Sequence, residues 1–543
     1  MIELNPNLLF TPEFADELLS SPINGTNSRG VYNPMQFVLR LRKDIHKELE
    51  SIEPGVRRGP FSDNQTQAFS TYLHETIHWW QHVGSNFGLI SSLKFPAQTH
   101  IVHTELKALL NDYGAFKSIK KFDSLHSENI HVNKILNFWH DIEFAGQIAF
   151  DHKRMFTIAN NPYFDCWGHS YNIMWGSVIS TLASTFDNQF SFLPNIKKWE
   201  YGFRLLREKK VKGFYYGSPN GIPPIGIKAI YEGQARFSQL QYLFNALEQK
   251  LSLNDFAKIG MLQGVYVEAF NLFLGILGEK TPLRADDPLI GLFLLLCDIA
   301  INPTDGFPFD ITHYESFIFL NDPGYRFFIL CQMIRDKHRN LKSIIKDYSK
   351  EEYIAISSIL AKSISCFSPY ESSAYIIHWI NKENAIKNLL EQELVYKYSS
   401  ENLPIRLFFS KFLRFQEDKF KYPQLFCWPG MNFATVKGNT VNMSEVYQLF
   451  EKHKALFIDD AHGNVYHSAI ENYTEKQIDE TFNDFYSWNA SYDMVRKWIV
   501  EEGPFTFNYD WLTSKFSRDQ MIQWASNNFE TSFGVNPNKF KIL

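Results

Sequence analysis

Residues 69–80 read Phe-Ser-Thr-Tyr-Leu-His-Glu-Thr-Ile-His-Trp-Trp and contain the pattern around which the fold is expected to form. The apolar side chains recur at intervals of four, four and three residues, at Phe69, Leu73, Ile77 and Trp80. This spacing places them on one face of an α-helix, which would bury that face against the core. We therefore expect a helix over residues 61–93, capped by one of the polar residues 62–64, with Gly84 as a signal for its end.

Two histidines on this helix are spaced to bind one cation. His74 and His78 lie four residues apart, so a helix turns both imidazoles to the same side, each with a nitrogen about 2 Å from a shared Zn2+ ion. Glu75 is turned about 100° from His74, where it could take a proton from a water beside the ion. With 17 His and 59 acidic residues in 543 positions, His-Glu-x-x-His would occur by chance in at most about 6% of shuffled chains. The alternative is a pair of histidines hydrogen-bonded at the edge of a core.

The pattern His74-Glu75-x-x-His78 resembles the signature of the zincin metallopeptidases, whose subfamilies differ in their third metal ligand. The resemblance implies Zn2+ as the cofactor and Glu75 as the general base. The subfamily that takes a third His shortly after the second does not fit, because residues 79–84 read Trp-Trp-Gln-His-Val-Gly. His82 is expected beside the site or at the surface, since one straight helix cannot wrap three successive turns around an ion.

The third ligand is expected to be Glu232, on a later helix. Residues 231–235 read Tyr-Glu-Gly-Gln-Ala and resemble the Glu-Gly-x-Ala helix of many gluzincin-type zincins, which supplies their third ligand. Gly233 and Ala235 have little bulk, which would let this helix approach the motif helix closely. Between His78 and Glu232 lie 153 residues, more than in compact members of the group, so the resemblance implies an insertion between the two helices. Glu143, on a helix with small residues beside it, is the alternative third ligand.

Hydrolysis at such a site also needs a donor aimed at the developing oxyanion. We take His169 as this donor, with Tyr231, Tyr215 and Tyr216 as alternatives. Tyr231 is the weaker choice because neighbouring residues on a helix point in different directions. Arg236 lies four residues after the third-ligand Glu and could steady that carboxylate or bind a substrate carboxylate. An ordinary ion pair on the helix surface would explain it equally well.

The whole chain is expected to be a predominantly α-helical α+β protein, with a zincin-like metallopeptidase core and helical additions. Four units are predicted: an N-terminal segment at 1–60 with a strand, the zincin-like catalytic core at 61–250, a helical region at 251–424 and a C-terminal α/β unit at 425–543. Within the core, further helices are expected at 101–110, 135–156, 173–186 and 227–247. Alternating or β-branched stretches predict strands at 35–42, 456–460 and 464–467.

Composition excludes several classes of protein. Hydrophobic residues make up 45% and charged residues 21% of the 543-residue chain, as in ordinary globular proteins. The 54 basic residues are interspersed with 59 acidic ones, for a net charge of −5, so no surface for nucleic acid stands out. The longest apolar run, residues 289–296, is too short to cross a bilayer and predicts a buried helix. We expect neither nucleic acid nor a membrane as a partner.

The cysteines and the first residues of the sequence bear on the cellular compartment in which the protein is expected. The five cysteines show no CxxC spacing and lie far apart in the sequence, so we expect reduced structural thiols. The first residues, Met-Ile-Glu-Leu-Asn-Pro, lack the basic and apolar stretches of an export signal. Both features favour the cytoplasm.

Together these features predict a zinc-dependent metallohydrolase, namely a cytoplasmic metallopeptidase acting on peptides or proteins. Such an enzyme must be restrained, so we expect a gated cleft or a regulatory protein partner. The first alternative is a non-catalytic interaction protein that the metal stabilises, and the second is a zinc hydrolase of a non-peptide amide or ester. Mn, Co or Fe could occupy similar ligands.

Overall fold

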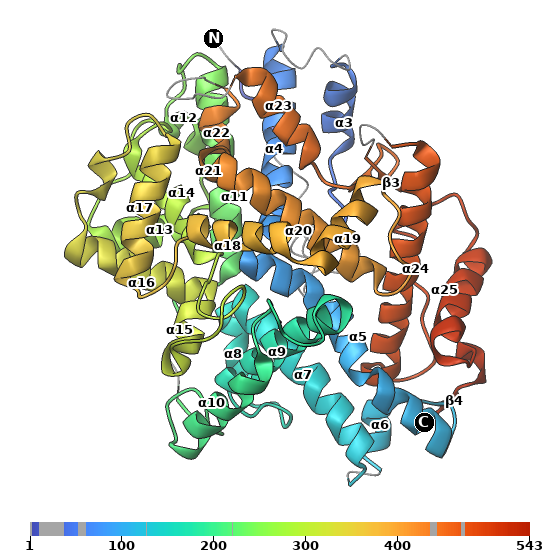
Figure 1. The fold of residues 1–543 in the computed structure, drawn as a ribbon. Helices are drawn as coiled ribbons and strands as arrows, with labels where there is room; N and C mark the ends of the chain where they lie inside the picture. The colour runs from blue at the N-terminus through green and yellow to red at the C-terminus, as the bar shows by residue number, and fades with distance from the viewer. Residues whose placement is uncertain are drawn as a thin grey trace.

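The chain is predominantly α-helical, as expected, with 67% in helices and 2% in strands (Figure 1). The computed structural model describes residues 3–9, 37–52, 61–125, 128–219, 221–434, 442–468 and 473–543. Within these ranges the strands form two small sheets, so the β part of the expected α+β architecture is minor. The zincin-like core and the boundaries of the four units stay predictions.

Helices follow one another along almost the whole described chain. Those before residue 250 are α1 (Pro6–Leu9), α3 (Lys43–Glu50), α4 (Asp63–Gly84), α5 (Asn86–Tyr113), α6 (Ile119–Asp123), α7 (Ile130–Phe150), α8 (Met155–Ile158), α9 (Trp167–Phe186), α10 (Ile196–Glu208) and α11 (Ile227–Ala246). Those after it are α12 (Leu253–Lys258), α13 (Val265–Leu277), α14 (Pro288–Ala300), α15 (Phe317–Asn321), α16 (Pro323–Lys337), α17 (Lys350–Ser363), α18 (Pro369–Lys382), α19 (Asn384–Leu394), α20 (Leu403–Lys421), α21 (Pro423–Cys427), α22 (Pro429–Asn432), α23 (Met443–Lys452), α24 (Glu475–Val500) and α25 (Arg518–Phe533). The expected helices at 135–156, 173–186 and 227–247 correspond to α7, α9 and α11.

The motif helix is α4, and its ends follow capping signals in the sequence. The Ser62 side chain accepts a hydrogen bond from the Gln65 N–H, and the Gln65 side chain accepts one from the Ser62 N–H. These bonds satisfy two of the free donors at the start of the helix. The helix ends at Gly84, where a Cβ atom would lie 2.4 Å from the Phe415 ring. Ser85 then caps α5, so the single helix expected at 61–93 is in fact two helices.

Helix α11 lies along α4, and most of its side chains are buried. The expected role of Gly233 is corrected by the structure: a Cβ atom there would lie 3.1 Å from Phe293 and 3.7 Å from Ala269. The glycine therefore makes room for α13 and α14, not for α4. Polar side chains join α11 to α4 instead, because Gln81 of α4 donates to Gln234 of α11 at 2.9 Å.

The strands are short. In the described ranges they are β1 (Phe116–Lys117), β2 (Phe457–Asp459), β3 (Val465–His467) and β4 (Lys541–Ile542). The antiparallel pair β2–β3 confirms the two strands expected in the C-terminal unit, and β1 pairs with β4 in parallel. The strand expected at 35–42 is reduced to one parallel bridge between Leu39 and Ile458. Phe37 has a positive φ of 46°, which interrupts the extended backbone; the first two residues of that run lie outside the described part.

One large hydrophobic core collects side chains from Leu8 to Ala525. A second, smaller cluster lies where α5, α7, α24 and α25 meet. The apolar run at 289–296 belongs to the buried helix α14, as expected. All five cysteines are free and buried, as expected for structural thiols. None of the helices in the described ranges combines the length and the apolarity that crossing a bilayer requires.

Candidate metal centre

Three side chains from two helices bring metal-binding atoms together. His74 Nε2 and His78 Nε2 are 3.2 Å apart, and Glu232 Oε2 lies 3.5 Å from the first and 3.4 Å from the second. A tetrahedral ion with bonds of about 2.0–2.2 Å needs ligand atoms roughly 3.3–3.6 Å apart. The triangle of these three atoms, which we call the triad, therefore fits an ion the size of Zn2+. Over the described residues, it is the one group of three His, Cys, Asp or Glu ligand atoms within 4.8 Å of one another.

The triad lies deep in the core. His74, His78 and Glu232 are 2%, 0% and 2% exposed. Burial disfavours a charged imidazole and holds the pKa of His74 well below its usual value. Burial acts on His78 in the same direction, but the Glu232 carboxylate, helped by Glu75 and Gln81, outweighs it and raises the pKa of His78. A cation at the centre of the triangle would satisfy both imidazoles and the carboxylate at once.

Gln81 orients one of the two imidazoles. Its side-chain N–H groups donate to the Tyr231 carbonyl oxygen at 3.0 Å and to the Gln234 side chain at 2.9 Å. Its side-chain oxygen must then accept the proton of His78 Nδ1, 2.8 Å away. In the neutral ring this network leaves the lone pair of His78 Nε2 facing the other two atoms of the triad, and such partners of metal-binding histidines fix both tautomer and ring orientation. Sequence analysis missed this role, although Gln81 lies one turn after His78.

Glu75 is buried beside the triad. Its side chain is 1% exposed, and its negative charge contributes to the raised pKa of His78. On α4 its direction differs by about 100° from that of His74. A carboxylate placed in this way can accept a proton from a molecule held at the triad. The surroundings of Glu75 are therefore compatible with the general-base role that the sequence predicts.

Tyr266, on α13, is a further residue of the site that the sequence analysis missed. Its ring meets the His74 ring edge-on with 6.0 Å between the ring centres. The Arg236 guanidinium lies over the ring of the same tyrosine, 4.0 Å from the ring centre. Arg236 is 1% exposed, so its interpretation as a surface ion pair is wrong. Tyr266 stands in a largely apolar helix that carries no recognised motif, and only the packing of α13 on α11 brings it to the triad.

The structure separates the two candidates for the third ligand. Glu143 lies on α7 and accepts a hydrogen bond from a glutamine one turn later, at 2.9 Å. Glu232 is the carboxylate that stands with the two histidines. His82 is buried beside α11, with its ring centre 5.3 Å from that of Tyr231. Burial lowers the pKa of His82 to about 3, so this imidazole stays neutral near neutral pH.

The oxyanion donors suggested by the sequence lie in different places. His169 Nε2 is 3.3 Å from the Asp141 carboxylate and lines a hollow of about 230 Å3 beside α10. Tyr215 is half-buried in the loop before α11, and Tyr216 is 79% exposed. Tyr231 is buried, with its hydroxyl directed toward a backbone carbonyl of α4. The donor role of His169 stays a prediction, and Tyr266 becomes a further candidate.

Comparison of the chain with models of protein families, with curated proteins and with solved structures gives no match.

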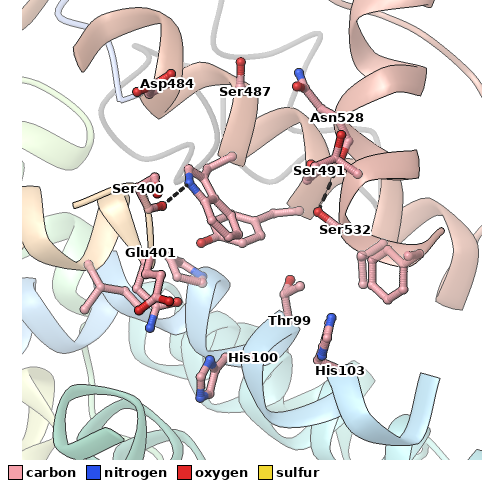
Figure 2. Close-up of a pocket in the computed structure, with 18 of the residues that line it drawn as sticks. Thr99, His100, His103, Ser400, Glu401, Asp484, Ser487, Ser491, Asn528 and Ser532 are labelled. Atoms are coloured by element: carbon pink, nitrogen blue, oxygen red, sulfur yellow. Dashed lines mark hydrogen bonds between the residues drawn. The ribbon is translucent and has the colours of Figure 1, made fainter. Parts of the chain in front are cut away.

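A larger hollow of about 760 Å3 lies between α5, α24 and α25 (Figure 2). Hydroxyl, amide and imidazole groups line it, among them Thr99, His103, Ser491 and Asn528 (Figure 2). It shares no lining residue with the triad. The charged side chains that line it, Lys107, Glu401 and Asp484, are exposed, so this hollow differs from the triad in being open to solvent.

Proposed function

We propose that this protein is a metal-dependent hydrolase, and specifically a zinc metallopeptidase of the gluzincin type. The observation that carries the proposal is the triangle of His74 Nε2, His78 Nε2 and Glu232 Oε2, with sides of 3.2, 3.4 and 3.5 Å. Two imidazoles and one carboxylate form the ligand set of catalytic zinc sites, which keep a fourth position for water or substrate. The five buried free thiols fit the cytoplasmic location expected from the sequence.

A bound Zn2+ ion would lower the pKa of a water molecule and polarise the carbonyl group of a substrate. In this chain, Glu75 would take a proton from the attacking water and pass it to the leaving amine. Gln81 would keep His78 in the tautomer that binds metal. Tyr266, packed against His74, or His169 would donate a hydrogen bond to the developing oxyanion.

Metal content and hydrolysis, measured on the same preparations, test the proposal. We expect about one zinc ion per chain in the wild type and in Glu75→Gln, but hydrolysis of a mixed peptide library only in the wild type. Glu143→Gln is the matched control, because it changes the same residue type outside the triad and should keep both metal and activity. A wild-type chain that binds no metal, or a fully active Glu75→Gln, would refute the proposal.

The oxyanion donor can be identified by a pair of substitutions. If Tyr266 donates, Tyr266→Phe lowers kcat by about 100- to 1,000-fold, whereas His169→Gln leaves it close to the wild-type value. The reverse pattern would identify His169. Zinc content serves as the control for both variants, since neither residue belongs to the triad.

The deep burial of the triad favours one alternative, a structural metal site in a non-catalytic interaction protein. His74, His78 and Glu232 are each no more than 2% exposed, whereas a catalytic site must admit its substrate. In that case Glu75→Gln would change neither metal content nor any measured activity, and the metal would contribute to stability alone. The experiment on Glu75→Gln therefore separates the two functions.

A further inference from the structure

The N-terminal segment Glu3–Leu9 is held by side chains of the two helices that carry the triad. Gln67 of α4 accepts a hydrogen bond from the Asn5 N–H at 2.7 Å and donates to the Glu3 carbonyl oxygen at 3.2 Å. The Thr71 hydroxyl, one turn further along α4, donates to the Leu8 carbonyl oxygen at 2.6 Å. The segment therefore advances along α4 in the direction of the metal centre as its residue numbers rise.

The residues of α4 that bind this segment lie in line with Glu75. Gln67, Thr71 and Glu75 are spaced four residues apart, so they form one stripe on the helix surface. The first two bind the main chain of the segment, and the third is the proposed general base. Successive members of such a stripe are about 6 Å apart along the helix. The Leu8 carbonyl is thus held one helical turn before Glu75.

Helix α11 also binds the segment, through side chains that approach the Leu9 carbonyl oxygen. Arg236 Nη1 and Gln239 Nε2 approach the Leu9 carbonyl oxygen at 3.4 and 3.5 Å. These residues follow Glu232 by four and seven positions, so all three lie on one face of α11. Gln239 also donates to the Thr71 hydroxyl at 3.2 Å, which joins the two helices. Thr71, Arg236 and Gln239 are each no more than 1% exposed. With Glu232 they form a buried strip of polar groups that begins at the triad and binds the Leu8 and Leu9 carbonyl groups.

We propose that this strip between α4 and α11 is the groove that binds the main chain of a polypeptide substrate, and that Glu3–Leu9 occupies it in competition with the substrate. The inference rests on the proposed hydrolase function, because it takes the triad as the reacting centre. It deepens that function by naming the substrate class and a means of restraint within the chain itself.

The contacts of the segment indicate what kind of polypeptide fits. The bonds from Gln67, Thr71, Arg236 and Gln239 go to backbone N–H and C=O groups, which every polypeptide presents. The side chains of Leu8 and Leu9 are 3% and 1% exposed within the core. A competing substrate would therefore be bound through its main chain, with a preference for two adjacent apolar residues.

Peptide binding tests the groove independently of hydrolysis. Full-length protein carrying Glu75→Gln and loaded with zinc is mixed with a fluorescent peptide, Glu-Leu-Asn-Pro-Asn-Leu-Leu, and anisotropy is measured. We expect at least tenfold tighter binding when the segment is loosened by Leu8→Ala with Leu9→Ala, or removed by deletion of residues 1–9. Adding Thr71→Val to the loosened chain should weaken binding several-fold. Asn7→Ala, an exposed position of the same segment, is the matched control and should behave like the intact chain.

The outcomes separate this inference from the proposed function. Equal peptide affinity in the intact and loosened chains, or no peptide binding by a loosened chain that is folded and holds zinc, would overturn the groove. Absence of zinc and of hydrolysis in the wild type would instead overturn the hydrolase. If the chain lacking residues 1–9 does not fold, the variant with Leu8→Ala and Leu9→Ala tests the groove instead. Circular dichroism and zinc content then show whether that variant is folded.

Discussion

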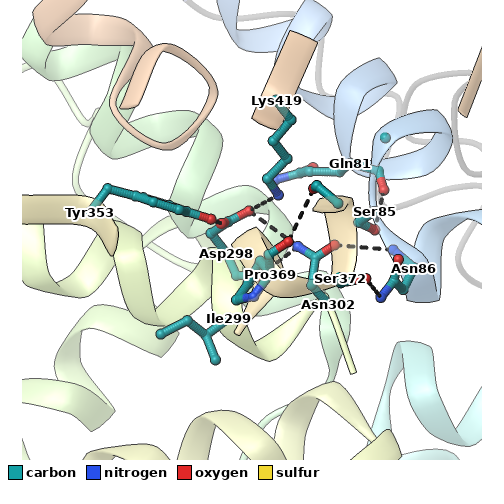
Figure 3. A network of polar contacts seen from close by, with 12 residues as sticks. Gln81, Ser85, Asn86, Asp298, Ile299, Asn302, Tyr353, Pro369, Ser372 and Lys419 are labelled. Carbon is teal, nitrogen blue, oxygen red and sulfur yellow. Dashed lines mark hydrogen bonds and ion pairs between the residues drawn. The ribbon is translucent and has the colours of Figure 1, made fainter. Parts of the chain in front are cut away.

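The triad and the network around Asp298 are two buried polar clusters that differ in how their charges are balanced. Asp298 Oδ1 accepts hydrogen bonds from Lys419 Nζ at 2.6 Å and from the Asn302 side chain at 3.2 Å, and Oδ2 accepts one from the Tyr353 hydroxyl at 2.6 Å (Figure 3). Asp298 and Lys419 are each 4% exposed. A cationic side chain of the protein thus compensates this carboxylate and ties α14, α17 and α20 together.

The triad is buried as deeply as the Asp298 cluster, but no lysine or arginine belongs to it. It brings two imidazole nitrogens and a carboxylate oxygen to within 3.5 Å of one another, and all three are atoms that can give a lone pair to a cation. Buried charge is costly unless it is paired or coordinates a metal. The Asp298 cluster thus contains its own cation, whereas the three atoms of the triad could hold one supplied from solution.

The largest effect is expected from breaking the internally balanced cluster. Lys419→Met leaves the Asp298 carboxylate buried without its cation, which should lower the free energy of unfolding by about 3–5 kcal/mol. Urea denaturation measures the loss. Combining it with Asp298→Leu should recover most of the stability, because neither charge of this buried pair then remains. A loss under about 1 kcal/mol would mean that the ion pair contributes little.

Removing the metal should have the next largest effect. At a free zinc concentration 100 times its Kd, binding stabilises the folded state by about 2.7 kcal/mol. A chelator should therefore lower the stability of the wild type by that amount and leave a Glu232→Gln chain almost unchanged. Lys419→Met should respond to chelation as the wild type does. An equal response of Glu232→Gln would show that the metal binds elsewhere.

Acidification should lower the free energy of unfolding through the buried His82. The pKa of His82 is lowered to about 3 by burial, whereas an unfolded His titrates near 6.5. As pH falls toward and below 6.5 the unfolded chain binds a proton that folded His82 does not, so stability falls as pH falls, by about 2 kcal/mol between pH 8 and 5. In metal-free protein, His82→Gln should show a shallower loss over this range. Parallel curves for the two proteins would contradict the assignment.

The smallest effect is expected from trimming the Asp298 network. Tyr353→Phe removes one hydrogen bond to the carboxylate and keeps the Lys419 and Asn302 donors, so a loss of about 1.5–2 kcal/mol is expected. Thermal and urea unfolding provide the measurement, and zinc content should not change. A loss as large as that of Lys419→Met would indicate that Tyr353, not the lysine, is the main partner.

Local patterns allowed much of the fold to be predicted. The apolar spacing of residues 69–80 predicted a helix, and Ser62, one of the expected caps, starts α4. The buried helix α14 and the pair β2–β3 followed from short runs of a few residues. The predicted end of the motif helix and the predicted role of Gly233 were wrong, because residues distant in the sequence pack at both positions. Phe415 contacts Gly84 and Phe293 contacts Gly233, and neither contact can be seen in a local pattern.

The two imidazoles of the site followed from local spacing alone, because a separation of four residues on one helix places His74 and His78 side by side. It also singled out Glu232 as the preferred third ligand, with Glu143 left open. The packing of α11 on α4 was needed to show which carboxylate stands within 3.5 Å of both histidines, across 153 intervening residues. Tyr266 meets His74, and the segment Glu3–Leu9 meets α4 and α11, only through packing of separate elements, since local spacing fixes directions on one helix and not the distances between helices.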